Sequence, residues 1–136
     1  MSKALVLDTH ILVWAALKPE SPLASIVERV LLKQAPFHVC ASVVAEYQNV
    51  LNRPEFRPKG LPPQWLPRLL QVAFQEPEPA PWPQEGPDPD DLVFLALANA
   101  TGAVLATGNG AHFPIAIRRE VEVLAPAEYL TRYPGV

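Results

Sequence analysis

Short apolar runs alternate along this chain with longer segments of helical periodicity. Residues 3–8 place four apolar side chains directly before Asp8, with no room for a helical turn, and predict a short buried strand with Asp8 at its carboxyl end. Residues 37–40, 103–106 and 121–124 predict three further strands.

Helical patterns fill the intervals between these strands. Ser21 and Pro22 are typical of an N-cap and a first helical position, and the apolar residues that follow recur at i, i+3, i+4 and i+7. Ser42 predicts another N-cap, and Gly102 predicts a helix end. The predicted helices cover residues 11–17, 22–31, 42 to about 52, 64–74 and 92–100.

Alternating strands and helices favour an α/β fold, a mainly parallel sheet covered by helices on both faces. The proline-rich, acidic residues 76–87 predict an extended surface loop, and residues 1–136 are expected to form one domain. Because ligands of such folds gather at the carboxyl ends of the strands, Asp8 lies where a site is expected.

Composition narrows the functional classes. A formal net charge of -3 and a pI near 5.6 argue against coating nucleic acid by bulk positive charge, but they allow an enzyme whose site is a carboxylate cluster. Cys40 has no second cysteine with which to pair, and the start of the chain is too short for a signal peptide. The longest apolar stretch, 92–98, falls short of a membrane helix, so we expect a cytoplasmic protein without membrane contact.

Three acids are candidates for chemistry, each with a plainer alternative. An ionised Asp8 at the end of a buried strand needs a partner, although it could instead cap the next helix. Glu46 should border the core one turn into its helix, or be an ordinary surface glutamate. Asp88 and Pro89 are typical of a helix start, so Asp91 could be a first-turn acid. If these acids converge, they form an oxygen-rich site suited to Mg²⁺ or Mn²⁺.

The segment 107–114 follows a strand and is rich in turn-forming residues. It could be an ordinary loop. Alternatively, Thr107 and Asn109 could hydrogen-bond a carboxylate, a bound water or a phosphate, and His112 could contact phosphate.

A phosphotransfer protein is one rival interpretation of a strand-terminal aspartate. A haloacid-dehalogenase-like phosphatase needs a second aspartate two residues later, where this chain has His10. A receiver domain needs a late lysine, and the last lysine of the chain is Lys59. Both absences count against phosphotransfer.

Four segments in this order resemble PIN-domain proteins over essentially the whole chain, close to the branch that includes toxins of toxin–antitoxin pairs. They are LVLDT at 5–9, SVVAEYQNVLNRPEF at 42–56, DPDDLVFLALA at 88–98, and ATGN at 106–109 with HFP at 112–114. The resemblance implies a three-layer α/β/α fold and an endoribonuclease in which Asp8, Glu46 and Asp91 hold a divalent ion, Mg²⁺ or Mn²⁺.

By the same resemblance, Thr107 and Asn109 orient water or the phosphate. Asn109 stands where the common family pattern has a fourth acid, which weakens the case for a second metal ion. The implied partners are an RNA substrate, a cognate antitoxin and a second copy of the chain. Candidate phosphate contacts, or simply solvated charges, are Arg53, Arg57, Lys59, Arg118 and Arg119. The alternative function is a catalytically silent PIN-fold module that binds RNA or protein.

Overall fold

A parallel sheet lies at the centre of the computed structural model, which describes residues 2–135. Strands β1 (Leu5–Leu7), β4 (Val104–Ala106) and β5 (Val123–Leu124) pair in parallel in the order β1-β4-β5. Strands β2 (His38–Val39) and β3 (Phe74–Gln75) form a second parallel pair. A parallel bridge between Leu5 and Phe37 joins the two, so the strands run in the order β3-β2-β1-β4-β5.

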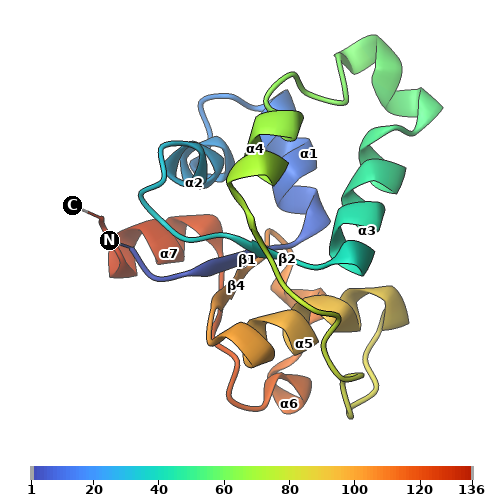
Figure 1. Ribbon diagram of the computed structural model, residues 1–136, viewed down its shortest axis with the longest axis vertical. Coiled ribbons are helices and arrows are strands. Elements are labelled where there is room, and N and C mark those ends of the chain that lie inside the picture. The colour runs from blue at the N-terminus through green and yellow to red at the C-terminus, as the bar shows by residue number, and fades with distance from the viewer. Residues whose placement is uncertain (1, 136) are drawn as a thin grey trace.

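Helices cover both faces of these strands. Figure 1 shows α1, α2 and α4 on one side of the strands and α5 and α6 on the other, while α3 rises at the edge of the assembly. The α-helices are α1 (Thr9–Leu17), α2 (Pro22–Leu31), α3 (Ala41–Leu51), α4 (Leu66–Val72), α5 (Leu92–Thr101), α6 (Ile115–Arg118) and α7 (Pro126–Arg132). Short 3-10 helices are η1 (Pro54–Lys59), η2 (Pro89–Asp91) and η3 (Gly110–His112). The three-layer α/β/α class is therefore confirmed.

Local signals in the sequence account for several element boundaries. Ser21 Oγ accepts a hydrogen bond from the Ala24 backbone N–H at 3.3 Å, and Pro22 opens α2 as expected. Gly102 ends α5 in the left-handed region, with φ of 70°, where a side chain would be strained. Each predicted strand is present, although shorter than its apolar run.

The start of α3 differs from the prediction. Helix α3 begins at Ala41, with Cys40 at the N-cap position and no side-chain cap, so Ser42 is a residue of the first turn. The Ser42 backbone N–H instead donates to Glu78 Oε1 at 2.6 Å, and its hydroxyl contacts the second oxygen of the same carboxylate. A carboxylate from the proline-rich loop thus caps this helix, which no pattern near residue 42 indicates.

The predicted helix over 64–74 is wrong at its carboxyl end. Helix α4 stops at Val72, Ala73 is extended, and Phe74 begins β3. The Phe74 backbone N–H donates to Phe37 O at 2.7 Å, so pairing with β2 overrides the helical stripe. Strand β3 and helices α6 and α7 were not predicted.

Buried apolar side chains fill the space between the layers. They include all of β1 and β4 and the central residues of α5. Tyr47 on α3 stacks against Phe94 on α5, with ring centroids 6.3 Å apart, and links the edge helix to the buried one. Within residues 2–135, every helix is too short or too polar to cross a membrane.

Candidate active site

Asp8 and Thr107 meet at the carboxyl ends of two neighbouring strands. Because β1 pairs with β4 in parallel register, the residues that follow Leu7 and Ala106 emerge side by side. Asp8 is 3% exposed, and its Oδ2 accepts a hydrogen bond from the Thr107 hydroxyl at 2.8 Å. Asp8 occupies the N-cap position of α1, but its side chain makes no cap hydrogen bond. Its carboxylate therefore faces the site, and the capping alternative is wrong.

Tyr47 anchors α3 beside this pair. It is fully buried, and its hydroxyl donates to the carbonyl of Leu7, the residue before Asp8, at 2.6 Å. Burial raises the pKa of Tyr47 well above its ordinary value, and the charge of Asp8 adds to the rise, so the phenol stays protonated and keeps donating. Glu46 precedes Tyr47 on the helix and is half-buried. No motif in the sequence marks Tyr47 as part of a site, although it lies on the apolar stripe of α3.

The turn η2 delivers Asp91 from the other side of the sheet. Asp88 Oδ1 accepts a hydrogen bond from the Asp90 backbone N–H at 3.0 Å, which confirms Asp88 as the cap. Asp91 is the last residue of η2, and its side chain is 14% exposed. Its buried Oδ2 lies 3.0 Å from His112 Nδ1, the distance of an ion pair, and has no hydrogen-bond partner among residues 2–135.

Burial and mutual repulsion perturb the ionisation of Asp91. Burial, and then the negative charges of Asp8 and Asp88, raise the pKa of Asp91 from 3.8 to about 6, against the opposing effect of His112. Groups with such a strong shift are common at functional sites.

The pKa of Glu46 is raised by burial and by some of the same negative charges. Burial raises the pKa of Glu46 above its ordinary value, and the charges of Asp90, Asp88 and Asp8 act in the same direction. Arg53 opposes them. Asp8 after β1, Glu46 on α3 and Asp91 in η2 therefore share one electrostatic environment.

The residue types of Asp8, Glu46 and Asp91 suit a hard divalent cation, but the three side chains do not form a close ligand group. They are carboxylates, they repel one another, and one buried oxygen of Asp91 lacks a partner. Yet among residues 2–135 no group of three or more His, Cys, Asp or Glu side chains lies close enough to hold a metal jointly. A Mg²⁺ ion bound through one or two carboxylates and several waters needs no such group.

Asn109 contacts Thr107 and does not itself contact the carboxylate of Asp8. It is exposed, and its Oδ1 accepts from the Ala111 backbone N–H at 3.2 Å, which caps η3. Its own backbone N–H donates to the Thr107 hydroxyl oxygen at 3.1 Å. Thr107 is thereby fixed between Asn109 and the carboxylate of Asp8.

The basic candidates divide into two groups. Arg118 donates through Nε to the Phe113 carbonyl at 2.6 Å, and Arg119 lies 5.9 Å from the centre of the Trp82 ring, so both have local structural contacts. Arg53, Arg57 and Lys59 are exposed on the segment that extends beyond the end of α3 (Figure 1).

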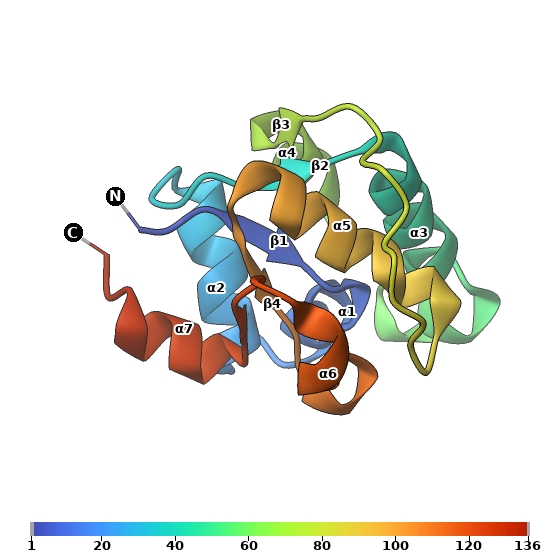
Figure 2. The same ribbon diagram turned by 90° about the horizontal axis from the view of Figure 1, so that it is seen from below.

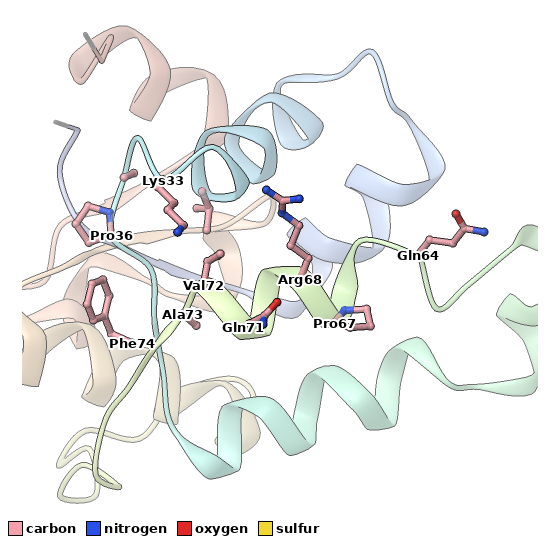
Figure 3. A pocket seen from close by; sticks show the side chains of 11 residues that line it. Lys33, Pro36, Gln64, Pro67, Arg68, Gln71, Val72, Ala73 and Phe74 are labelled. Carbon is pink, nitrogen blue, oxygen red and sulfur yellow. The ribbon is translucent and has the colours of Figure 1, made fainter.

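A groove of about 1100 Å³ lies at the opposite end of the strands. Figure 3 shows Lys33 and Pro36, before β2, facing Arg68 and Val72 of α4 across it. None of the candidate acids lines this groove.

Comparison with known proteins connects this geometry to a family. A family model described as "PIN domain" matches residues 4–111. No curated protein matches the chain.

Several solved structures share the fold, and three of them are compared here with this chain. VapBC2 from Rickettsia felis, bound to a DNA fragment from its promoter, has a TM-score of 0.60 and 19% identity over 88% of this chain and 96% of that chain. PAE2754 from Pyrobaculum aerophilum has a TM-score of 0.60 and 13% identity over 95% and 88%, respectively. FitAcB from Neisseria gonorrhoeae has a TM-score of 0.54 and 18% identity over 90% and 98%.

Proposed function

This chain belongs to the PIN-domain family, whose members are nucleases, and we propose that it is a divalent-metal-dependent endoribonuclease that hydrolyses phosphodiesters. The observation that carries the proposal is the shared environment of Asp8, Glu46 and Asp91 at the carboxyl ends of the parallel strands. In this environment the pKa of Asp91 rises to about 6. Buried carboxylates whose charges raise the pKa of a neighbouring acid are costly to the protein unless a cation compensates them.

PIN domains generally use divalent metal ions, and Asp8, Glu46 and Asp91 are the residues that would hold one here. When bound, such an ion supplies an activated water and neutralises charge that develops on the phosphate. Thr107 donates to one oxygen of Asp8 and so leaves the other free for a ligand. Tyr47 keeps α3 against the end of β1, which holds Glu46 near the other two acids. His112 lowers the pKa of Asp91 and so favours the ionised carboxylate that a cation needs.

The finer assignments rest on the resemblance to the toxin branch of the family and on the fold shared with VapBC2 and FitAcB. RNA is the substrate of choice, and the chain acts as the toxin of a toxin–antitoxin pair. It forms one domain over residues 1–136, works in the cytoplasm and pairs with a second copy of itself.

Cleavage of RNA by the purified protein tests this function. The protein should cut mixed RNAs in Mg²⁺ or Mn²⁺ but not in chelator, and Asp8→Asn should reduce cleavage to background. Glu85→Gln, which changes an exposed acid of the proline-rich loop in the same way, is the matched control and should cut normally. Equal cleavage by the wild-type and Asp8→Asn proteins would reveal a contaminating nuclease and refute the assignment.

A catalytically silent PIN-fold module is the second candidate. It is favoured by one observation, the lack of a close three-ligand group among residues 2–135. Such a module would bind RNA equally well with and without Mg²⁺ and would leave the RNA intact. The cleavage assay above separates the two functions.

A further inference from the structure

Helix α1 exposes a single line of side chains. His10 and Trp14 are its only exposed residues, and Lys18, at the C-cap position, is exposed one turn later. The three residues are spaced i, i+4 and i+8, so they lie on one face of the helix, about 6 Å apart along its axis. We refer to these three residues as the α1 strip.

Trp14 is the central feature of the strip. Its side chain is 44% exposed although the rest of α1 is largely buried, and the Lys18 ammonium lies 5.1 Å from the centre of its ring. Helical side chains lean toward the N-terminus, so Trp14 leans toward His10 and Lys18 leans over Trp14. The strip therefore presents a flat aromatic surface with a cation beside it.

The strip begins at the candidate active site. Asp8 directly precedes α1, and the His10 ring lies 6.1 Å from the ring of His112. His112 in turn contacts Asp91. A chain bound along the strip would thus run from the carboxylates toward the far end of α1, which rises from the end of β1 beside α3 (Figures 1 and 2).

We propose that the α1 strip binds the single-stranded RNA substrate beside the scissile phosphate, with a base stacked on Trp14 and a phosphate paired with Lys18. This inference rests on the proposed nuclease function and adds to it the positioning of the substrate. Aromatic faces that alternate with cations are the usual means of holding unpaired nucleotides, because every base has a face that can stack.

The strip suits RNA better than a protein partner. Helix α1 has no acidic residue that would repel phosphate. Three side chains in one line are also far too small for a stable protein interface, which needs about 800 Å² on each side. Outside the strip, α1 offers no exposed apolar residue to extend such an interface.

Binding of a fluorescently labelled single-stranded RNA of mixed sequence, measured by anisotropy in chelator, tests the proposal. Trp14→Ala should raise Kd roughly 5- to 100-fold, the loss expected for one stacked base, whereas Trp14→Phe should stay within about 3-fold of the wild type. Lys18→Ala should lower the slope of log K against log salt by about 1. Ile115→Ala removes a side chain that is 80% exposed on α6, and should leave Kd unchanged.

Steady-state cleavage of the same RNA in Mg²⁺ adds a second readout. Trp14→Ala should raise KM with kcat nearly constant, because stacking helps to bind the substrate before and during the reaction alike.

Binding that is lost in Trp14→Ala but restored in Trp14→Phe supports the strip even if the wild type cuts no RNA, so the inference can survive the failure of the proposed function. Normal RNA cleavage with unchanged Kd and KM in Trp14→Ala overturns the strip and leaves the nuclease standing. The proposal is also overturned if Trp14→Ala weakens the binding of duplex RNA as much as that of single-stranded RNA. It is overturned as well if Trp14→Ala binds RNA normally and loses only the binding of a co-expressed protein.

Discussion

Replacing Asp91 with asparagine should stabilise the metal-free protein while abolishing cleavage. The carboxylate lies among other acids, and burial together with the charges of Asp8 and Asp88 raises its pKa from 3.8 to about 6, against the opposing effect of His112. Asparagine keeps the size of the side chain and removes the charge. The substitution therefore relieves repulsion at the place where a metal ion would otherwise compensate it.

The pKa sets both the size and the pH range of the effect. A rise from 3.8 to about 6 corresponds to about 3 kcal/mol, and we expect about 1–2 kcal/mol in practice, because solvent screens part of the repulsion and the contact with His112 is lost. A carboxyl whose pKa is raised by folding lowers the free energy of unfolding at any pH above its folded pKa. That loss shrinks as the pH falls from about 6 toward 3.8, because in this range the folded protein binds the proton more strongly than the unfolded chain does.

Urea unfolding in chelator at pH 7.5, 6.0 and 4.5 measures this difference. Asp91→Asn should be more stable than the wild type at pH 7.5, and about one third of that difference should remain at pH 4.5, because the unfolded carboxyl, with a pKa of 3.8, is still mostly ionised there. Excess Mg²⁺ should reverse the order, because the ion stabilises only the protein that binds it. Glu85→Gln is the matched control, since it removes an exposed acid from the proline-rich loop and should leave the free energy of unfolding nearly unchanged at each pH.

One result would refute this reasoning. If Asp91→Asn costs about 1 kcal/mol at pH 7.5 and cleaves RNA normally, Asp91 is only a first-turn acid that favours the helix start. A gain in stability that does not change with pH would locate the effect outside the carboxylate cluster.

Three further substitutions probe the supports of the site. Tyr47→Phe removes the hydroxyl that donates to the buried carbonyl of Leu7, and should lower the free energy of unfolding in urea by about 1–3 kcal/mol. A loss below about 0.5 kcal/mol, the lower limit for a net hydrogen bond, would mean that this bond does not hold α3 in place. Glu78→Gln should cost about 0.5–1 kcal/mol of unfolding free energy at pH 7. Hydrogen bonds from Ser42 hold the pKa of Glu78 below its ordinary value, so the difference should vanish as acid protonates Glu78. A loss that does not depend on pH would contradict this cap. Asn109→Asp should tighten Mg²⁺ binding in calorimetric titration and destabilise the protein in chelator; unchanged affinity would place residue 109 outside the reach of the ion.

Local signals were sufficient to predict most of the fold. The cap at Ser21, the stop at Gly102 and the apolar runs before Asp8 and Thr107 each act within a few residues of the element they define. Strand β3 could not be predicted in this way, because Phe74 is extended through pairing with Phe37, 37 residues away. The cap of α3 was missed for the same reason, since Glu78 is distant from Ser42 in the sequence.

Asp8 shows how tertiary pairing decides between two locally equivalent roles. Its backbone has the extended conformation of an N-cap residue, so sequence alone allowed its side chain to cap α1. The parallel register of β1 with β4 brings the Thr107 hydroxyl to this carboxylate, and the hydroxyl donates to Asp8 Oδ2 at 2.8 Å. The charge of Asp8 then adds to the burial of Asp91 in raising the pKa of Asp91. The electrostatic character of the site therefore follows from strand register, which no single motif encodes.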